Sequence, residues 1–452
     1  MEIKNPFIFR NYDIRGVADS DLPDKDVIAI GKAFGTRLIR QGKRDINVGR
    51  DCRLSSERLY KSLVQGIFST GCTIRNLGIC TTPMLYFSLF CFNADGGIMI
   101  TGSHNPPEYN GFKLCVGQDS LDGEKLQELR QMIEADDFHA GTGDCFTGSV
   151  TEAYLEYLST DCVLDRPLTI VIDSGNGVAG TVAIPLFKKL GCTVIPLFEK
   201  PDGRFPNHVP NPLKPENMAA CVERVVNEKA DFGIAYDCDG DRLGVVDDKG
   251  KILWGDSLMI LFAREILSRK PNALFISEVT SSQSLYDEIS RLGGTVIMGK
   301  MGHTNIKAKM KEMNAALGAE LSGHIFFNDG YLGFDDAIYA TRRLLEIVAA
   351  SDTPLSELLS DITPLFSTPE IRIPVPDEEK FRIAQKVTDH FKKENYSVID
   401  IDGCRVNFKD GWGLVRASNT QPALTMRFEA ISEDALHIIE KTVRTVVDEV
   451  MS

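Results

Sequence analysis

Apolar and polar positions along this chain follow helical and strand periods in turn. From residue 26 to residue 40 the apolar side chains recur at helical spacing, at Val27, Ile30, Ala33, Phe34 and Leu38. The run at 45–49 predicts a strand, strand and helix signals then alternate as far as Ile98, and 121–133 predicts another helix. This alternation is typical of a parallel, doubly wound α/β sheet.

The same order begins again near residue 150. A helix is predicted at 151–158, followed by a strand at 168–173 and a glycine turn at 174–180. Such a turn can present backbone N–H groups to a phosphate, but its spacing fits no nucleotide-binding motif, which favours tight packing of helix on strand. The proline-rich connection at 201–217 is long enough to indicate a functional or interfacial loop.

A third alternation of helix and strand patterns follows residue 250. The pattern predicts a helix at 256–268, strands at 273–276 and 296–298, and a helix at 355–362. Prolines between 364 and 376 then indicate a linker joined to an edge strand, because proline cannot donate a hydrogen bond to a central ladder.

The last part of the chain has a different pattern. A helix at 377–393 precedes three strand-like runs, and a C-terminal helix carries Ile439, Val443, Val446 and Val450 on one face. The three runs lie at 397–401, 413–417 and 424–430. We therefore expect three consecutive doubly wound α/β domains and then a smaller antiparallel α+β domain, at residues 1–150, 151–250, 251–365 and 366–452.

The composition is that of a globular protein, with 43% hydrophobic and 25% charged residues in a chain of 452. A net charge of -14 argues against a nucleic-acid-binding surface and against docking on an anionic membrane. No apolar run reaches the ~20 residues that span a bilayer, and the eleven cysteines show no zinc-type spacing. Because no signal peptide precedes them, we expect reduced thiols and a cytoplasmic protein.

A polar loop from Thr101 to Lys113 follows the apolar run at 97–100, and α/β proteins place ligand sites at such strand ends. Pro106 and Pro107 stiffen the turn and restrain Ser103. A stiff hydroxyl can serve as a nucleophile or a phosphoryl carrier, but the same residue types are also ordinary loop residues. The segment lacks the Gly-x-Ser-x-Gly elbow of hydrolases, so the loop alone leaves these alternatives open.

Three aspartates at alternate positions, Asp237, Asp239 and Asp241, follow another short apolar run. Their charges would repel one another unless a cation lies among them, and hard carboxylate oxygens suit Mg²⁺ or Ca²⁺. An EF-hand is excluded, because its sixth and twelfth positions hold Arg242 and Asp248 here. Three carboxylates around Mg²⁺ would leave coordination positions for water or a phosphoryl oxygen.

Two further loops carry polar groups. One offers Glu320 and Ser322 to hydroxyl groups and His324 to proton transfer, although such residues are also common on surfaces. The other, at 416–422 with Arg427 beyond it, has the composition of an anion cradle or of a hydroxyl-rich hairpin turn.

Four segments occur together in the order found in one known family. They are Thr101-Gly102-Ser103-His104-Asn105-Pro106, Asp237-Cys238-Asp239-Gly240-Asp241-Arg242, Glu320-Leu321-Ser322-Gly323-His324 and Arg416-Ala417-Ser418-Asn419-Thr420. They resemble the four active-site loops of the α-D-phosphohexomutase superfamily, and the segments at 9–16, 203–208 and 411–415 match as well. The resemblance covers nearly the whole chain. It implies four domains around a central cleft, the fourth similar to the TATA-binding-protein type of fold.

The resemblance implies a phosphohexomutase that interconverts hexose 1-phosphate and hexose 6-phosphate. Ser103 would be carried as phosphoserine, with one Mg²⁺ ion bridging its phosphate to Asp237, Asp239 and Asp241. The phosphoryl group would pass to the free sugar hydroxyl, and the resulting 1,6-bisphosphate would turn round in the cleft and return its other phosphate to Ser103. A hexose 1,6-bisphosphate activator is implied as well.

The resemblance also implies roles for other residues. Arg15, Lys113 and Arg242 would flank the reacting phosphate, and His324 would help to move protons. Substrate contacts would come from Tyr12, His303, Glu320, Ser322, Arg416, Ser418, Asn419 and Thr420, with Arg427 in the anion cradle. The implied partner is a hexose phosphate, with neither nucleic acid nor membrane, and the chain would be a monomer or a homodimer.

Leu321 fits the Glu-x-Ser-Gly-His form of the bifunctional phosphomannomutase/phosphoglucomutases, which the chain resembles most. Thr280 stands where those enzymes commonly have a lysine, Cys238 replaces a glycine and Gln421 replaces a threonine. Mannose and glucose differ only at C2, so the loop cannot rank these two substrates. The alternatives are a phosphoglucosamine mutase, a phosphosugar phosphatase and a non-catalytic phosphosugar-binding protein.

Overall fold

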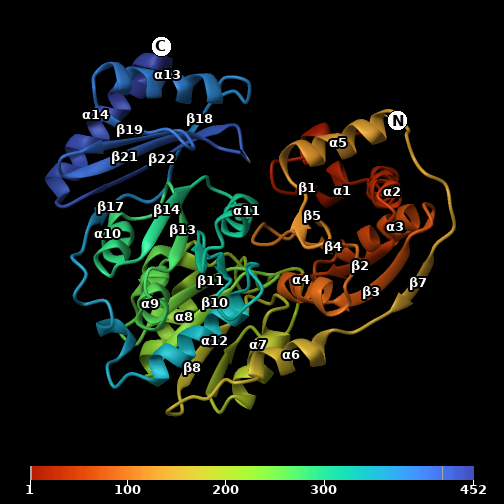
Figure 1. The fold of residues 1–452 in the computed structure, drawn as a ribbon, viewed down its shortest axis with the longest axis horizontal. Coiled ribbons are helices and arrows are strands. Elements are labelled where there is room, and N and C mark those ends of the chain that lie inside the picture. The colour runs from red at the N-terminus through yellow and green to blue at the C-terminus, as the bar shows by residue number, and fades with distance from the viewer. Residues whose placement is uncertain (1–2, 420, 452) are drawn as a thin grey trace.

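The computed structural model describes residues 3–419 and 421–451, which fold into four sheets in chain order (Figure 1). We call the sheets with their helices the first to the fourth unit. In Figure 1 the first unit lies on the right, the second and third lie at the lower left, and the fourth lies at the upper left. No described helix combines the length and apolar character needed to cross a membrane.

The sheet of the first unit has seven strands in the order β1-β5-β4-β2-β3-β7, with β6 beside β5. Its strands are β1 (Ile14–Val17), β2 (Asp45–Arg50), β3 (Thr73–Ile79), β4 (Gly96–Ile100), β5 (Tyr109–Val116), β6 (Asp119–Ser120) and β7 (Asp144–Thr147). Strands β2, β3, β4 and β7 are parallel, whereas β5 runs antiparallel to β4 and β1. The sheet is mixed, not wholly parallel as expected, because residues 101–108 turn the chain directly back from β4 into β5.

Helices cover both faces of this first sheet. They are α1 (Ala18–Asp21), α2 (Asp24–Arg40), α3 (Ser56–Phe68), α4 (Thr82–Cys91) and α5 (Gly123–Glu134), after a short 3-10 turn at Pro6–Ile8. The apolar side chains of α2, α3 and α5 share one core with the sheet. Those of α4 belong to a different core, which continues into the second and third units.

The second unit has a five-stranded sheet in the order β12-β11-β10-β8-β9. Its elements are α6 (Thr151–Ser159), β8 (Thr169–Asp173), α7 (Gly180–Lys189), β9 (Thr193–Leu197), α8 (Pro215–Glu228), β10 (Phe232–Tyr236), β11 (Leu243–Asp247) and β12 (Ile252–Leu253). Strand β12 pairs with β11 as the second arm of a hairpin. The sheet therefore extends just beyond the boundary expected at residue 250.

The third unit has four strands in the order β14-β13-β15-β16. Its elements are α9 (Gly255–Arg269), β13 (Leu274–Glu278), α10 (Gln283–Arg291), β14 (Thr295–Gly299), α11 (His303–Met313), β15 (Leu317–Ala319), β16 (Ile325–Phe327) and α12 (Ala337–Ala349). The helix expected at 355–362 is wrong. Only a 3-10 turn forms, at Leu355–Glu357, because Leu355 is buried whereas the apolar residues after it are only partly covered.

The fourth unit is an antiparallel sheet covered by two helices, as expected. Its elements are β17 (Phe366–Ser367), β18 (Ile371–Pro374), α13 (Lys380–Lys393), β19 (Ser397–Ile399), β20 (Cys404–Phe408), β21 (Gly411–Ala417), β22 (Ala423–Ala430) and α14 (Glu433–Met451). Strand β20 was not predicted from the sequence. The proline-containing β18 lies at an edge and pairs only with β22, as the prolines predicted.

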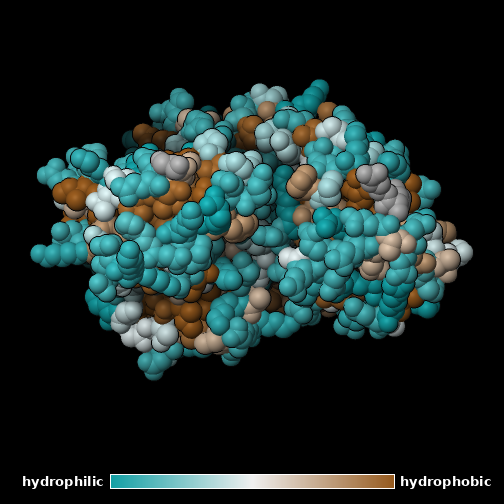
Figure 2. Space-filling model, turned by 90° about the horizontal axis from the view of Figure 1, so that it is seen from above, coloured by the Kyte–Doolittle hydropathy of each residue, from teal (hydrophilic) through white to brown (hydrophobic). Residues whose placement is uncertain are grey.

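The hydrophobic cores show how the units are joined. One continuous core runs from α4 through the second unit and into the third. The fourth unit has a separate core and meets the third through a small cluster of Val279, Trp412 and Leu414. Viewed from above, the molecule has a hollow between its two lateral halves, bordered mainly by hydrophilic residues (Figure 2).

Candidate active site

Each loop singled out in the sequence begins where a strand ends. We name them the serine loop (101–108, after β4), the aspartate loop (237–242, after β10), the glutamate loop (320–324, after β15) and the arginine loop (416–422, at the end of β21). Side-chain contacts join the serine loop to the aspartate loop and the aspartate loop to the glutamate loop. The arginine loop contacts the N-terminal segment through Asn419 and Tyr12.

Ser103 is held in an unusual backbone conformation. Its φ is 47°, in the left-handed region that few residues other than glycine adopt. Its backbone N–H donates to Thr101 Oγ1 at 2.8 Å. The side chain is buried and its hydroxyl donates to Asp237 Oδ2 at 2.8 Å. The serine loop therefore aims one hydroxyl at the aspartates, which is a typical use of local backbone strain at functional sites.

Arg53 holds the serine loop in place through hydrogen bonds to its backbone, a role that the sequence did not reveal. Its guanidinium donates to the backbone oxygens of Ser103, Asn105, Pro106 and Tyr109 at 2.5–3.0 Å. Arg53 Nε also pairs with Asp51 Oδ2 at 3.2 Å. A planar fork with five N–H donors can bind several carbonyls at once, which explains why arginine occupies this position.

The three aspartates converge as the sequence predicted. Asp237, Asp239 and Asp241 are fully buried, and each offers a carboxylate oxygen within 4.8 Å of the others. Asp237 Oδ1 accepts the backbone N–H groups of Gly240, Asp241 and Arg242 at 3.0–3.2 Å. The loop is thus folded around one oxygen of Asp237, while the other oxygen faces Ser103.

Lys113 supplies the positive charge nearest to the aspartates. Its ammonium donates to Asp239 Oδ2 at 2.8 Å and also to Asp241 Oδ2. Burial acts to raise the pKa of Asp239, but the charge and hydrogen bond of Lys113 outweigh it and hold that pKa below its ordinary value. Burial, followed by the charges of Asp239 and Asp241, raises the pKa of Asp237 well above its ordinary value. One lysine therefore balances part of the negative charge.

The aspartate loop fits a divalent cation. Asp239 Oδ1 and Asp241 Oδ1 are buried and have no hydrogen-bond partner among the described residues. Buried carboxylate oxygens without partners are costly unless a cation binds them. Oxygen ligands of this kind suit a hard cation such as Mg²⁺.

Arg242 and His324 connect the aspartate loop to the glutamate loop. Arg242 Nε donates to His324 Nε2 at 2.8 Å, so Nε2 is an acceptor in this arrangement. His324 Nδ1 lies 3.1 Å from Asp335 Oδ2 and carries the ring proton if the imidazole is neutral. Burial and then the Arg242 charge lower the pKa of His324, which favours that neutral form. Asp335 also pairs with Lys307 at 3.1 Å.

Two further predicted residues, His303 and Arg15, contact the glutamate loop and the serine loop respectively. The ring of His303 stacks on that of His324 with centroids 5.3 Å apart. Arg15 is buried against the serine loop, where it donates to Gly102 O at 3.1 Å and to Asn105 Oδ1 at 2.5 Å. Arg15 therefore helps to shape the loop that carries Ser103.

Glu320 is the first residue of the glutamate loop, directly after β15. Its Oε1 accepts the backbone N–H of Gly302 at 2.6 Å, and its Oε2 accepts the hydroxyl of Ser322 at 3.2 Å. Burial first, and then the neighbouring Glu278 carboxylate, raise the pKa of Glu320 to about 8. A carboxyl group with this pKa can either donate or accept a hydrogen bond near neutral pH.

Tyr12 of the first unit contacts both the third and the fourth units. Its hydroxyl donates to Met301 O in the third unit at 2.8 Å and accepts a hydrogen bond from Asn419 Nδ2 in the fourth unit at 2.7 Å. The structure therefore brings the first, third and fourth units together at one side chain.

The arginine loop is held by an ion pair and by a backbone hydrogen bond. Arg416 is buried and pairs with Asp402 at 3.3 Å, but its Nε has no partner among the described residues. Ser418 donates its backbone N–H to Ala423 O at 2.9 Å, which closes the turn. Thr420 lies outside the described residues.

Arg427 points elsewhere. Its guanidinium donates to the backbone oxygen of Thr280, lies 3.9 Å from Asp256 and packs over the Trp412 ring. Its contacts with Thr280 and Asp256 thus join the fourth unit to the third. The sequence placed Arg427 in the anion cradle because it follows the arginine loop at short range, whereas pairing of β21 with β22 decides the direction of its side chain.

Three charged residues that support the site were missed in the sequence, namely Arg53, Asp335 and Asp402. Asp402 accepts the backbone N–H of Met301 at 3.0 Å in addition to its pairing with Arg416. None of the three belongs to a recognisable local motif. Their partners are distant in the chain, so no sequence pattern could have identified them.

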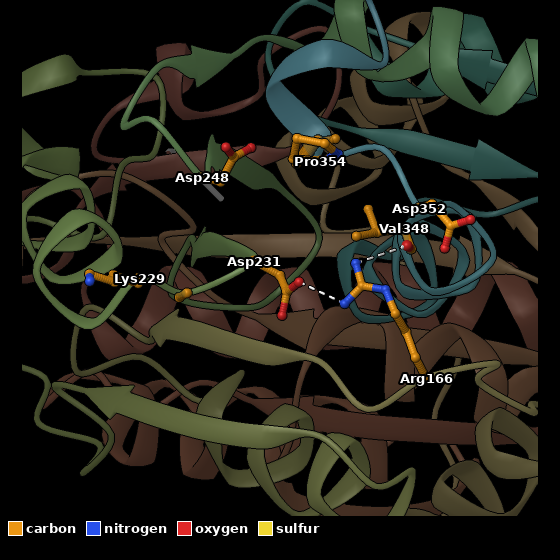
Figure 3. Close-up of a pocket in the computed structure, with 9 residues that line it drawn as sticks. Arg166, Lys229, Asp231, Asp248, Val348, Asp352 and Pro354 are labelled. Atoms are coloured by element: carbon orange, nitrogen blue, oxygen red, sulfur yellow. Dashed lines mark hydrogen bonds and ion pairs between the residues drawn. The ribbon is translucent and has the colours of Figure 1, made fainter.

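A separate pocket of about 200 Å³ lies between the second and third units (Figure 3). Figure 3 shows Arg166 reaching across it to Asp231 and to the backbone of Val348, with contacts at 2.8 and 3.3 Å. Its lining contains none of the predicted site residues. The ion pair between Arg166 and Asp231 lies within the second unit, and the hydrogen bond from Arg166 to Val348 O joins that unit to the third.

Comparison with known proteins identifies a matching family for each part of the chain. The family models that match are phosphoglucomutase/phosphomannomutase alpha/beta/alpha domain I at residues 6–140, domain II at 152–250, domain III at 254–366 and the C-terminal domain at 370–446.

Individual relatives cover almost the whole chain. The phosphomannomutase/phosphoglucomutase of Pseudomonas aeruginosa is 43% identical over 97% of this chain and 94% of its own length. The phosphoglucomutase of Neisseria gonorrhoeae is 43% identical over 98% of this chain and 96% of its own length. A solved structure of a phosphoglucomutase/phosphomannomutase family protein from Burkholderia thailandensis matches with a TM-score of 0.94 at 39% identity, covering 99% of this chain and 98% of that one.

Proposed function

The chain belongs to the phosphoglucomutase/phosphomannomutase family, and we infer that it is a phosphohexomutase, an isomerase that interconverts hexose 1-phosphate and hexose 6-phosphate. We propose that Ser103 carries the phosphoryl group that is transferred. The observation that supports this role most directly is the hydrogen bond from Ser103 Oγ to Asp237 Oδ2 at 2.8 Å. This bond places the hydroxyl beside Asp237, Asp239 and Asp241. Among the described residues, these three form the only candidate metal-binding group made of carboxylates alone.

The cofactor proposed is one Mg²⁺ ion, held by Asp237, Asp239 and Asp241 together with the phosphate on Ser103. When bound, this ion supplies positive charge that offsets the charge of the transferring phosphoryl group. Phosphoryl transfer depends mainly on positioning and on charge neutralisation, so the surrounding cations are as important as the nucleophile. Lys113, Arg15 and Arg242 surround Ser103 and the aspartates and are suited to contact the phosphoryl oxygens.

We propose that the arginine loop binds the phosphate group of the substrate that is not reacting. Arg416, Ser418, Asn419 and Thr420 would hold the phosphate that is not reacting, because an arginine fork with hydroxyl and amide donors suits a phosphate dianion. This role is supported by the buried Nε of Arg416, which has no hydrogen-bond partner among the described residues.

The sugar is proposed to bind between the two phosphate sites. Glu320 and Ser322 would contact sugar hydroxyls, and His303 and Tyr12 would line the space around the ring. The pKa of about 8 for Glu320 suits a group that meets hydroxyls in two orientations, since it can act as donor or acceptor.

Proton transfer is assigned to His324. Its neutral ring accepts from Arg242 through Nε2 and is oriented through Nδ1 by Asp335. When Arg242 turns to a phosphate, Nε2 becomes available to take the proton of the attacking sugar hydroxyl. The proton passes to Ser103 Oγ as its P–O bond breaks, and in the second transfer, after the 1,6-bisphosphate has turned round, Ser103 Oγ gives up a proton as it attacks and the departing sugar oxygen takes one.

Mannose and glucose phosphates are the proposed substrates, and a hexose 1,6-bisphosphate is the proposed activator that restores phosphate to Ser103. The supporting observations are Leu321 in the glutamate loop and the similarity of the chain to a phosphomannomutase/phosphoglucomutase and to a phosphoglucomutase. The test is conversion of mannose 1-phosphate, glucose 1-phosphate and glucosamine 1-phosphate with Mg²⁺ and a trace of the bisphosphate, followed by intact-mass measurement of the protein. Conversion of the first two supports the proposal. Strong preference for glucosamine phosphate would replace it with a phosphoglucosamine mutase, and release of free phosphate in step with substrate loss would indicate a phosphatase.

A further inference from the structure

Arg405 is a buried arginine at the contact between the fourth unit and the third. It lies on β20, and its side chain is fully buried. Its guanidinium donates three hydrogen bonds into the third unit, to Val279 O at 2.6 Å, to Ser281 O at 2.9 Å and to Gln283 Oε1 at 3.2 Å. Burying a guanidinium is unfavourable unless it is hydrogen-bonded, so these three oxygens hold Arg405 in one position.

A second arginine and a tryptophan complete this contact. Arg427 on β22 donates to Thr280 O, so two arginines of the fourth unit bind the three consecutive backbone oxygens of residues 279–281. The guanidinium carbon of Arg405 also lies 3.8 Å from the centroid of the Trp412 ring. The backbone of residues 279–281 is therefore fixed to the fourth unit.

The same segment supports the glutamate loop. Glu278 is the last residue of β13 and directly precedes the bound backbone oxygens. Its Oε1 accepts the backbone N–H of Leu321 at 3.0 Å and the hydroxyl of Thr280 at 2.6 Å. Leu321 is the chain neighbour of Glu320. The position of Glu320 therefore depends on the segment that Arg405 holds.

Within the fourth unit, Arg405 is tied to the arginine loop. Strand β20 pairs antiparallel with β21, with Arg405 opposite Leu414, and β21 carries Arg416 near its end. A Cβ atom at Gly403, just before β20, would lie 2.4 Å from Val415 O and 2.8 Å from the Cα of Arg416, so the two strands are in close contact. Arg405 and Arg416 therefore belong to one tightly paired hairpin.

We propose that Arg405 is a positioning residue that sets the spacing between the arginine loop and the glutamate loop, so that one hexose phosphate reaches both. This inference rests on the proposed function, in which Arg416 binds the phosphate that is not reacting and Glu320 binds sugar hydroxyls. Because Arg405 is fully buried, it acts through these two loops and not through contact with the substrate. A lysine could not replace it, because one ammonium group lacks the planar fork that binds several oxygens at once.

The test separates the spacing of the loops from damage to either loop. Glucose 6-phosphate needs both loops, whereas inorganic phosphate occupies one phosphate site at a time. We expect full-length Arg405→Lys to bind glucose 6-phosphate roughly tenfold more weakly than the parent and inorganic phosphate within roughly threefold of it, measured by calorimetry with Mg²⁺ present. In the mutase assay KM should rise roughly tenfold, while kcat and the Mg²⁺ concentration for half-maximal activity stay within roughly threefold of the parent.

The matched control is Arg382→Lys, which changes an exposed arginine on α13 that pairs with Glu379. This variant should bind both ligands like the parent. Equal weakening of both ligands in Arg405→Lys would show that the arginine loop itself is damaged. Unchanged binding of glucose 6-phosphate would show that the spacing does not depend on Arg405. Either result overturns the proposal.

A second variant tests the same contact if Arg405→Lys does not fold. Gln283→Met keeps the length of the side chain and removes one of the three acceptors of Arg405. We expect this variant to bind glucose 6-phosphate roughly threefold more weakly and inorganic phosphate like the parent, because it loses one hydrogen bond to a charged group. Unchanged affinity for both ligands would then overturn the proposal.

Failure of the proposed function would give a different result from failure of this inference. If the parent converts no hexose phosphate, but Arg405→Lys still loses affinity for glucose 6-phosphate alone, the positioning role stands and the mutase assignment fails. If the parent converts hexose phosphates and Arg405→Lys binds both ligands like the parent, the mutase assignment stands and the positioning role fails.

Discussion

Ser103 Oγ donates a hydrogen bond to Asp237 Oδ2 at 2.8 Å, across the boundary between the first and second units. The two residues are separated by 134 positions in the chain. Their contact puts the proposed phosphoryl carrier beside the proposed metal ligands before any substrate binds.

Replacing Ser103 with alanine should remove the phosphoryl carrier. We expect Ser103→Ala to lose roughly 10³-fold or more in kcat, as expected for loss of a nucleophile, and to show no added phosphoryl mass after incubation with a hexose 1,6-bisphosphate. The matched control Ser268→Ala, at an exposed position of α9, should keep both the rate and the added mass. Normal turnover by Ser103→Ala would refute the carrier role.

Replacing Asp239 with asparagine should weaken metal binding more than folding. Asparagine keeps the shape of the side chain but removes a charge that both Lys113 and the proposed cation require. We expect the Mg²⁺ concentration for half-maximal activity to rise at least roughly tenfold, which corresponds to about 1.4 kcal/mol. Asp389→Asn, at an exposed position on α13, is the control and should titrate like the parent. An unchanged metal titration for Asp239→Asn would contradict the ligand assignment.

Replacing Arg53 with lysine should disturb the serine loop without touching the metal ligands. A single ammonium cannot span the four backbone oxygens that the guanidinium binds. We expect kcat to fall roughly 10²-fold, the effect of a misplaced reacting group, while Mg²⁺ affinity stays within a small factor of the parent. Arg40→Lys, which alters a surface ion pair with Asp137, serves as the control. The interpretation fails if Arg53→Lys turns over at the parent rate.

Adding a methyl group at Gly302 should push Tyr12 out of place. The Cβ of an alanine there would lie 2.4 Å from Cζ of the Tyr12 ring, and the residue has a φ of 112°. We expect Gly302→Ala to raise KM roughly tenfold, because Tyr12 would no longer reach Met301 and Asn419. Gly293→Ala has a similar positive φ of 80° but meets nothing within 4 Å, so it isolates backbone strain from the clash. Equal KM values for the two variants would exclude the Tyr12 explanation.

The stability of the metal-free protein should depend on pH through Glu320. Its pKa rises from 4.5 in the unfolded chain to about 8 in the folded protein, chiefly because the side chain is buried. Between these values the folded state binds the extra proton, so this carboxyl's contribution to stability is complete below about pH 4.5 and falls as the pH rises towards about 8. The slope cannot exceed about 1.4 kcal/mol per pH unit for one proton.

Glu320→Gln carries no titrating group and should lose this part of the pH dependence. We expect the Tm of Glu320→Gln to gain on that of the parent as the pH rises from about 5 to about 8, measured by calorimetry in the presence of a chelator. Glu312→Gln, whose carboxylate pairs with Lys309 at the surface, should follow the parent at every pH. A constant Tm difference between Glu320→Gln and the parent would show that Glu320 does not titrate in this range.

Much of the fold could be predicted because its signals are local. The strands β4 and β10 are visible as short apolar runs that end at Ile100 and Tyr236, each followed directly by a polar loop that begins with Thr101 or Asp237. The family and the four-domain fold class are confirmed by the matching family models and by the solved structure that matches. The functional assignment of individual site residues remains a set of predictions.

The errors in the fold arise where packing overrides periodicity. The segment at 355–362 has helical spacing, but only its first leucine is fully buried, and it forms a single 3-10 turn. Strand β20 has no long apolar run, yet it pairs on both sides within the fourth sheet. A strand of this kind is stabilised by its neighbours, so its own sequence does not predict it.

The sequence by itself determined which residues could do chemistry here, because the motifs around Ser103, Asp237 and Glu320 are continuous stretches whose residue types have few other uses together. Only the tertiary structure decided which of these residues meet. The pairings of Lys113 with Asp239 and of Ser103 with Asp237 depend on how the first sheet lies against the second, and that of Arg53 with the serine loop depends on packing within the first unit. Contacts between such distant residues are produced by packing of whole sheets and helices, and no local pattern in the chain records them.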